Sequence, residues 1–357
     1  MLKPAHNHVV HGRYSHLCQR AIRSIVLASR PRGAPVAENF RLVERPCPEL
    51  SDGQVLLRTL WLSLDPYMRG SMDAAASYAP NVELDQPMPA ELVSAVQVSR
   101  HPDWQAGDIV VHDAGWQDRT VTDGAGLRRL DGRLAPVSTA LGVLGMPGMT
   151  AFVGLTNIAE PKPGETLVVA AAAGPVGSAV GQIAKIRGCR VVGIAGGERK
   201  CRYLLDELGF DAALDHRDSG LAARLADACP DGVDIYWENV GGRVSEAVLP
   251  LLNSFARIPV CGLVSIYSES DTTAFPGQSP SLMRAILTKR LRIQGFIVDD
   301  HAELAETFRR EMSNWLRDGR VRYREDITEG IEQAPSRFIA MLRGETFGKT
   351  LVRVSHP

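Results

Sequence analysis

The sequence predicts an α/β protein with two domains, a β-rich unit followed by a doubly wound parallel sheet. The chain has 357 residues. Proteins of this length usually divide into two domains, because a single hydrophobic core does not grow to this size. Residues 24–144 contain short β-like runs separated by Gly, Pro and Asp. From residue 166 onward, apolar runs of four to six residues alternate with helical stretches. Such near-continuous apolar strands, linked by helices, are typical of a parallel sheet covered on both faces.

The β-rich unit is expected at residues 24–144, after an N-terminal extension, residues 1–23, that we expect to be disordered. The extension is basic and has no acidic residue before Glu38, but it lacks the apolar core of a secretion signal. An organelle transit peptide and a start codon placed too far upstream remain open as alternatives. The strands expected in this unit span residues 24–27, 38–43, 53–66, 93–98, 109–112 and 120–122, in a barrel or sandwich pattern.

Gly- and Pro-containing stretches, "GMPGMTA" and "EPKPGE", mark the boundary between the two units. The second domain is expected over residues 145–320, with right-handed crossovers. Its expected strands are 167–171, 190–194, 212–214, 235–238, 257–260 and 292–297, and its helices are 176–187, 200–208, 220–229, 243–252 and 280–289. A helix at 302–318 follows. Strand-like segments at 321–328 and 349–354 predict that residues 321–357 return to the β-rich unit, leaving a ligand cleft between the domains.

The composition excludes several classes of function. Hydrophobic residues make up 45% and charged residues 23%, as in soluble globular proteins, and the net charge of −1 gives no general attraction to nucleic acid or membranes. No apolar run reaches the length of about 18 residues needed to span a bilayer. The six cysteines are scattered without a C-x-x-C pair, which favours reduced thiols in the cytoplasm.

A glycine motif after the first strand of the second domain predicts a dinucleotide site. Ala172-x-Gly174-x-x-Gly177 follows a strand and opens a helix. Gly174 would let the pyrophosphate approach the backbone, and Gly177 would let the helix pack closely on the strand. Ala173 and Val176 lie in the same turn, at the helix N-terminus that favours anions. The alternative is a tight turn with a purely structural role.

The end of the next strand predicts NADPH rather than NADH. NAD sites usually place an acid there to bind the ribose 2′-hydroxyl, but this chain has Gly196 and Gly197. Lys200 and His216 are candidates to bind a 2′-phosphate. The alternative is that Arg199 and Lys200 are ordinary surface bases.

No zinc site is expected. The nine histidines include none that pairs with Cys, Asp or Glu at zinc-ligand spacing in the β-rich unit. Without a metal, a substrate carbonyl must be polarised by a hydroxyl group or by the cofactor.

Several segments together resemble the zinc-free branch of the medium-chain dehydrogenase/reductase family. They are "LASRPRGAPVAENFRL", "LSLDPYMRG", "LGMPGMTAFVGL", "YWENVGG", "RIPVCGLVSIY" and "GETFGKTLVRV", and with the cofactor stretch they cover nearly all of residues 24–354. The chain is most similar to prostaglandin reductases, 2-alkenal reductases and NADPH-dependent curcumin reductases. The resemblance implies a GroES-like β-rich catalytic domain and a Rossmann NADPH-binding domain, assembled as a homodimer.

The resemblance also implies roles for individual residues. Lys200 would bind the 2′-phosphate, and Asn239 would lie beside the cofactor. Tyr267 would sit near the nicotinamide ribose and the substrate carbonyl, and Tyr67 would line the substrate cleft. Thr346 stands where relatives often have Asn, which puts that cofactor contact in doubt.

The implied activity is NADPH-dependent reduction of the carbon–carbon double bond of α,β-unsaturated ketones and aldehydes, by hydride transfer to the β-carbon. Tyr267 is the first candidate and Tyr67 the second to stabilise the enolate oxygen that forms. In the segment "MPAELVSAV", Ala90 and Glu91 replace small residues of relatives, which is expected to reshape the cleft wall. A quinone reductase of the same family and a non-catalytic NADPH-binding protein remain as alternatives.

Overall fold

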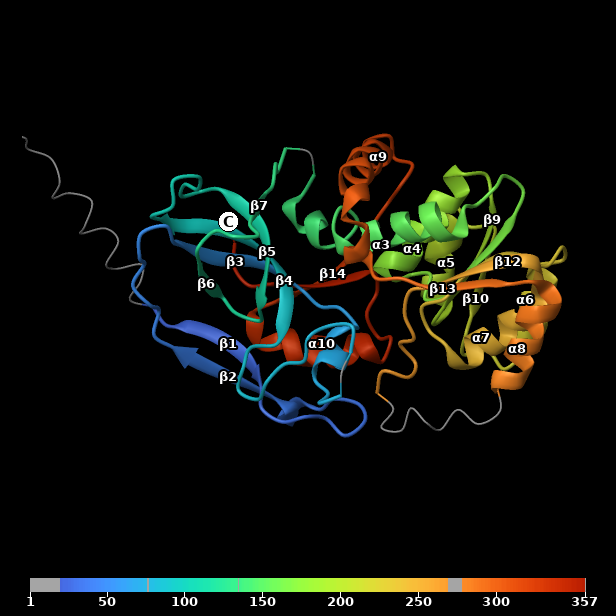
Figure 1. The fold of residues 1–357 in the computed structure, drawn as a ribbon, viewed down its shortest axis with the longest axis horizontal. Helices are drawn as coiled ribbons and strands as arrows, with labels where there is room; N and C mark the ends of the chain where they lie inside the picture. The colour runs from blue at the N-terminus through green and yellow to red at the C-terminus, as the bar shows by residue number, and fades with distance from the viewer. Residues whose placement is uncertain (1–19, 76, 134, 269–277, 357) are drawn as a thin grey trace, which may run out of the picture.

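The computed structural model describes residues 20–75, 77–133, 135–268 and 278–356. The expectation of a disordered extension therefore lies, for residues 1–19, outside the described residues. A β-rich unit and a parallel-sheet unit lie side by side along the long axis of the molecule (Figure 1). Both predicted units are therefore present, in the predicted order.

The β-rich unit is built around one mainly antiparallel sheet. Its strand order is β14-β15-β3-β4-β5-β7, with β6 paired to β3. A separate antiparallel pair, β1 and β2, lies beside it. The bounds are β1 Ile22–Leu27, β2 Phe40–Arg45, β3 Val55–Ser63, β4 Pro89–Ser99, β5 Ile109–Gly115, β6 Arg119–Thr122 and β7 Arg128–Arg129, with a short helix α2 at Met68–Ser71 after β3.

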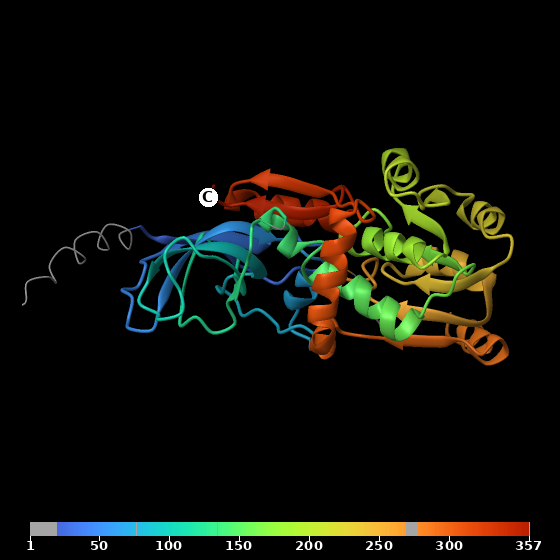
Figure 2. The same cartoon turned by 90° about the horizontal axis from the view of Figure 1, so that it is seen from above.

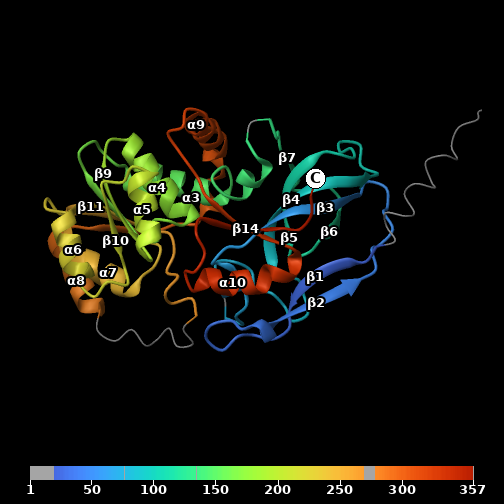
Figure 3. The same ribbon diagram turned by 180° about the vertical axis from the view of Figure 1, so that it is seen from behind.

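The C-terminal segment returns to the β-rich unit, as the sequence predicts. β15 (Lys349–Arg353) runs antiparallel to β3, with Leu351 opposite Ser63, and parallel to β14 (Glu325–Glu329). Helix α10 (Ala334–Leu342) connects β14 to β15 and lies below the sheet in Figure 3. This helix was not predicted, and the strand that was expected from residue 321 begins only at Glu325.

The second unit is a doubly wound parallel sheet, as predicted. Its order is β10-β9-β8-β11-β12-β13, so the chain starts near the middle and winds outward in both directions. The strands are β8 Thr166–Val169, β9 Arg190–Ala195, β10 Ala212–Asp215, β11 Val233–Trp237, β12 Leu252–Val260 and β13 Arg292–Gly295. The helices are α4 Pro175–Ile186, α5 Glu198–Asp206, α6 Leu221–Ala228, α7 Gly242–Val248 and α8 Gln278–Lys289.

One difference from the prediction concerns the junction between the units. Helix α3 (Met146–Gly154) occupies the stretch that the sequence analysis treats as a boundary. A Cβ atom on Gly148 would lie 2.0 Å from the Val143 carbonyl oxygen, so glycine there permits close packing of the helix start. The helix predicted at 302–318 is confirmed as α9 (Ala305–Arg317), which follows a 3₁₀ turn at Val298–Leu304 and stands at the same junction (Figure 2).

Hydrophobic cores on both faces of the parallel sheet explain why its central strands β8 and β9 are largely apolar. Phe152 of α3 and Phe308 of α9 pack in the core that also contains Val180 of α4. Leu221, Val248 and Leu252 pack in the core on the opposite face. Among the residues that the structure describes, no helix has both the length and the apolar character needed to cross a membrane.

Candidate cofactor and substrate site

The turn between β8 and α4 has the geometry of a phosphate-binding loop. Gly174 is the N-cap of α4, and the first hydrogen bond within the helix runs from the Ser178 amide to the Gly174 carbonyl at 3.0 Å. The amides of Val176 and Gly177 precede that bond, so they face the open end of the helix, where anions bind. A Cβ on Gly177 would lie 2.5 Å from the Ala171 carbonyl oxygen. Glycine is therefore required for the helix to start this close to the strand.

The sequence-predicted residues of this turn lie together. Ala173, at 4% exposure, immediately precedes Gly174, and the Ala172 amide donates to the Ile194 carbonyl of β9 at 2.9 Å. This hydrogen bond ties the turn to the strand that leads to Gly196 and Gly197. The phosphate loop and the candidate 2′-phosphate region are therefore neighbours at the carboxyl ends of two adjacent strands, β8 and β9.

At the end of β9, glycines take the place of an acidic residue. A Cβ on Gly196 would lie 2.8 Å from Nε2 of His216 and 3.4 Å from the Arg217 guanidinium. Gly197 has φ +88°, a conformation that favours glycine, and it caps α5. The first acidic side chain that follows, Glu198, is paired with Arg202 one helical turn later. The Glu198 carboxylate is therefore hydrogen-bonded to Arg202 on the same helix.

Cationic side chains gather around this turn. Burial is the main cause that lowers the pKa of His216, and the charges of Arg217, Lys200 and Arg243 lower it further, against the opposing effect of Asp215. Burial, followed by Arg217, also lowers the pKa of Lys200. Mutual repulsion among these groups would be relieved by an anion bound between them.

Lys200 also links the cofactor domain to the C-terminal segment. Its Nζ donates to the Gly344 carbonyl at 2.7 Å. Thr346, two residues further on, is 8% exposed. The structure thus places Lys200 close to the segment that contains Thr346, although the two residues are far apart in the sequence.

The turn after β11 is held in shape by its own side chains. Asn239 donates through Nδ2 to the Ala170 carbonyl at 2.8 Å and accepts from Nε1 of Trp237 at 3.1 Å. Glu238, at 5% exposure, accepts from the amides of Val240 and Gly241. Asn239 therefore joins the ends of the two central strands, β8 and β11, beside the phosphate loop.

Three tyrosines from both units form a second cluster. Tyr67 precedes α2 in the β-rich unit, and Tyr267 follows β12 in the cofactor unit. The Tyr267 hydroxyl accepts from the Leu263 amide at 3.4 Å and interacts electrostatically with Tyr78. Tyr78 also interacts electrostatically with Tyr67. The two predicted tyrosines are thus connected through a third tyrosine that the sequence analysis did not single out.

All three phenols keep their protons at neutral pH. Burial is the largest cause that raises the pKa of each hydroxyl. The carboxyl groups of Asp65, Asp113 and Glu91 raise the pKa of Tyr67 further. A protonated phenol can donate a hydrogen bond to a carbonyl or enolate oxygen.

Glu91 places a carboxyl group on the wall near Tyr67. It lies on β4 directly opposite Asp113 of β5. Burial, followed by the charges of Asp113 and Asp65, raises the pKa of Glu91 to about 8, while Lys349 and Arg128 oppose this shift. Burial also raises the pKa of Asp113. The departure at Glu91 therefore adds an ionisable group that is largely protonated at neutral pH.

This carboxyl predicts a pH-dependent stability. Between its usual pKa near 4.5 and its folded pKa of about 8, folded Glu91 holds a proton that the unfolded chain releases. Stability is therefore lost as the pH rises through this interval. We expect Glu91→Gln to raise the free energy of unfolding by about 4 kcal/mol at pH 8 and by less than about 1 kcal/mol at pH 5. Urea unfolding at both pH values measures this, and the same difference at both would contradict it.

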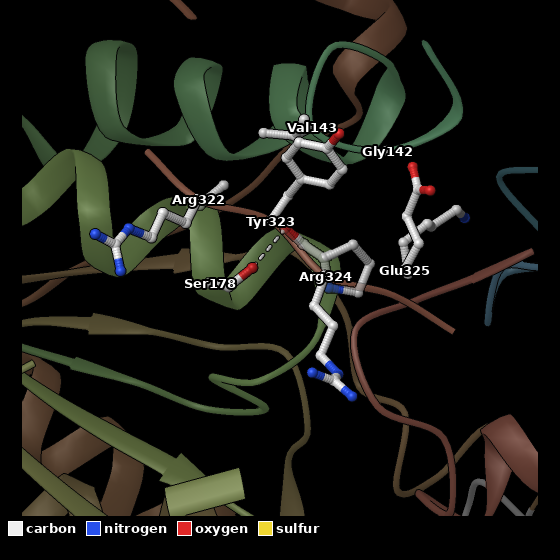
Figure 4. Close-up of a pocket in the computed structure, with 10 residues that line it drawn as sticks. Gly142, Val143, Ser178, Arg322, Tyr323, Arg324 and Glu325 are labelled. Carbon is white, nitrogen blue, oxygen red and sulfur yellow. Dashed lines mark hydrogen bonds between the residues drawn. The ribbon is translucent and has the colours of Figure 1, made fainter. Parts of the chain in front are cut away.

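A small cavity lies where the two units meet (Figure 4). Gly142 and Val143 line one side, Ser178 of α4 lines another, and residues 322–325 close it. Its accessible volume of about 10 Å³ corresponds to one water molecule. This cavity is too small for a cofactor or an enone.

The structure also bears on metal and thiol chemistry. Within residues 20–75, 77–133, 135–268 and 278–356, no three His, Cys, Asp or Glu side chains are grouped so that they could hold a metal ion. No disulfide joins the cysteines in the same ranges.

Two family models match the chain. The model described as "N-terminal domain of oxidoreductase" matches residues 23–130, and the model described as "Zinc-binding dehydrogenase" matches residues 175–315. The two matches correspond to the β-rich unit and to the cofactor unit.

Whole-chain relatives extend this result. The chain is 54% identical over 334 residues to an NADPH-dependent curcumin reductase of Escherichia coli (strain K12), covering 93% of this chain and 97% of that protein. It is 42% identical over 326 residues to prostaglandin reductase 1 of Rattus norvegicus, covering 90% and 95%. The structure of CurA from Vibrio vulnificus in complex with NADPH superposes with a TM-score of 0.90 at 49% identity, covering 94% of this chain and all of that one. The chain therefore belongs to the medium-chain dehydrogenase/reductase family, in the branch that contains the curcumin and prostaglandin reductases.

Proposed function

We propose that this protein reduces the carbon–carbon double bond of α,β-unsaturated ketones and aldehydes with NADPH. The observation that carries the proposal is that one chain contains both a candidate site for NADPH and a candidate site for a substrate carbonyl. One is a phosphate loop beside a cationic turn without a free acid, and the other is a cluster of protonated tyrosines contributed by both units. The names of the relatives support the same reaction.

The residues present fit NADPH. The turn at Gly174, Val176 and Gly177 would hold the pyrophosphate, because its amides face an open helix end. Lys200, His216 and Arg217 would hold the 2′-phosphate, because these bases interact with one another at the turn where glycines take the place of an acidic residue. When bound, NADPH supplies the hydride for the substrate β-carbon.

The chain itself supplies hydrogen-bond donors for the substrate carbonyl. The hydroxyl of Tyr267 is the first candidate to stabilise the developing enolate oxygen, and the hydroxyl of Tyr67 is the second. Tyr78 interacts electrostatically with Tyr267 and adds a third phenol beside it. The proton that the α-carbon requires reaches the substrate from solvent or from one of these phenols.

We further propose that residues 24–144 and 321–357 form the substrate-binding domain, that residues 145–320 form the cofactor domain, and that the protein is a cytoplasmic homodimer. The dimer proposal is supported by the free edge of the parallel sheet, where all four residues of β13 are exposed. Exposed apolar side chains lie nearby, with Phe255 63% exposed and Leu287 77% exposed. Pairing of two such edges would bury these surfaces.

Incubation with NADPH and a panel of enones, enals and quinones tests the proposed function. We expect loss of the NADPH absorbance with enones and enals. Consumption of NADPH with quinones alone would assign a quinone reductase, and NADPH binding without turnover of any compound would assign a non-catalytic binding protein.

Activity is also expected to be independent of zinc. Prolonged treatment with EDTA should leave the rate of enone reduction unchanged, because phenol hydroxyls polarise the carbonyl in this account. Elemental analysis of the purified protein should find less than stoichiometric zinc. A loss of activity with EDTA that added zinc restores would overturn this expectation.

A further inference from the structure

A buried ion pair joins the last strand of the protein to the turn that carries Tyr67. Lys349, the first residue of β15, pairs with Asp65, which follows β3, and the two side chains are 3% and 6% exposed. Nζ of Lys349 also donates to the Leu64 carbonyl at 3.1 Å. At this depth either charge alone would be costly, so each side chain holds the other in place.

The backbone before Tyr67 is fixed by this pair and its neighbours. Asp65 accepts a second hydrogen bond from the Ser63 hydroxyl, and its carbonyl accepts from the Met68 amide at 3.2 Å. The Leu64 amide donates to the Thr350 carbonyl of β15 at 3.2 Å. Tyr67 lies only two residues after Asp65, so the orientation of its ring depends on how this turn is held.

Lys349 is itself anchored from the cofactor side. Two residues earlier, Phe347 packs in the core of the parallel-sheet unit, edge-on to Tyr203 with ring centroids 5.0 Å apart. Gly348 has φ +89°, and a Cβ there would lie 2.3 Å from the Arg324 carbonyl oxygen. Residues 344–349 therefore form a short, tightly fitted connection between the Lys200 region and the Tyr67 turn.

We propose that Lys349 is a positioning residue, which acts through Asp65 to hold the Tyr67 hydroxyl against the substrate carbonyl. This proposal rests on the proposed function, because Tyr67 has to contact the substrate. The alternative is that the ion pair contributes only to the stability of the fold.

The decisive variant is Asp65→Asn combined with Lys349→Met. It removes both charges together, so no unpaired charge is left buried, and the introduced amide would keep a partner for Ser63. With an enone, we expect kcat to fall by about 10-fold, the same loss as for Tyr67→Phe, because misplacement of a group by a fraction of an ångström has effects of this order. The dissociation constant of NADPH should change less than about 2-fold, since the phosphate sites are untouched.

A double-mutant cycle separates positioning from stability. If the pair acts through Tyr67, adding Asp65→Asn and Lys349→Met to Tyr67→Phe should lower kcat by less than about 2-fold more. A further 10-fold loss in the Tyr67→Phe protein would overturn the proposal, as would an unchanged kcat in the Asp65→Asn, Lys349→Met protein. A purely structural role would affect both backgrounds alike.

The matched control removes a second partly buried pair far from the turn. Glu165 and Arg257 lie in the cofactor unit, with side chains 18% and 14% exposed. Glu165→Gln combined with Arg257→Met should lower Tm but leave kcat within about 2-fold. An equal fall in kcat for this control would show that loss of stability alone explains the effect.

A readout independent of turnover keeps this proposal distinct from the proposed function. In protein labelled with 3-fluorotyrosine, the ¹⁹F resonance of Tyr67 is assigned by its absence in Tyr67→Phe. It should shift or broaden in the Asp65→Asn, Lys349→Met protein and stay in place in the control. An unmoved resonance would overturn the positioning role. If the resonance moves but the protein reduces no enone, the ion pair still positions the Tyr67 ring, and the proposed enone reduction is wrong.

Discussion

Tyr267→Phe should lower kcat for enone reduction by about 10²–10³-fold, the effect of losing one donor to a developing oxyanion. The substitution removes one hydroxyl group and leaves the aromatic ring. The dissociation constant of NADPH should therefore stay within about 2-fold of its original value, and the loss should appear in kcat rather than in substrate affinity. Stopped-flow and steady-state kinetics with one enone measure these quantities.

Tyr203→Phe is the matched control for this substitution. The Tyr203 hydroxyl is buried and has no hydrogen-bond partner in the part of the chain that the structure describes. Its removal should leave kcat unchanged. A small effect of Tyr267→Phe together with a large effect of Tyr67→Phe would reverse the ranking of the two tyrosines. The main donor would then belong to the β-rich unit.

Lys200→Ala should weaken NADPH binding by about 1.5–3 kcal/mol, the range for a hydrogen bond to a charged group, and should leave NADH binding almost unchanged. The expected selectivity follows from the position of Lys200 beside Gly196, Gly197 and Arg217, where only NADPH would present a phosphate. Isothermal titration with each cofactor measures both dissociation constants.

Arg202→Ala provides the control on the same helix. Arg202 is paired with Glu198, and it lies on the side of α5 that faces Arg324 and Phe347. Its loss should change neither dissociation constant by more than about 2-fold. Equal weakening of NADPH and NADH by Lys200→Ala would reject its assignment to the 2′-phosphate.

Much of the cofactor unit could be predicted because its signals are local. The apolar strands are buried on both faces, so their sequences are continuous apolar runs, and the glycine motif lies within one turn. The β-rich unit gave weaker signals. Strand β4 extends from Pro89 to Ser99, but only residues 93–98, in its second half, were expected, since Glu91 interrupts the pattern.

The helices that were missed contain residues that usually mark boundaries. Helix α3 has Pro147 and Gly148 in its first turn, which suggested a linker, yet proline is favoured there and Gly148 permits close packing. Helix α10 likewise carries Pro335 near its start. In α3 the proline and glycine were interpreted as a break, although proline also starts helices, as it does in α10.

The residues of the candidate site that belong to family motifs could be predicted from the sequence. The residues that reach the site only through tertiary contacts were not predicted. Tyr78 lies outside the motifs, and only the fold brings it to Tyr267. Arg217 reaches Gly196 and Gly197 because β10 lies next to β9 in the sheet. A search for bases beside the predicted strand ends could have suggested Arg217, but Tyr78 lies between β3 and β4, away from any strand end.

The position of deuterium in the product distinguishes reduction of the carbon–carbon double bond from reduction of the carbonyl group. The protein is incubated with an α,β-unsaturated ketone and NADPH that carries deuterium at C4 of the nicotinamide, on the transferred face, and the product is analysed by NMR. The account predicts a saturated ketone with deuterium at the β-carbon and hydrogen from solvent at the α-carbon. An allylic alcohol with deuterium on the carbinol carbon, or no deuterated product while NADPH remains bound, would contradict it.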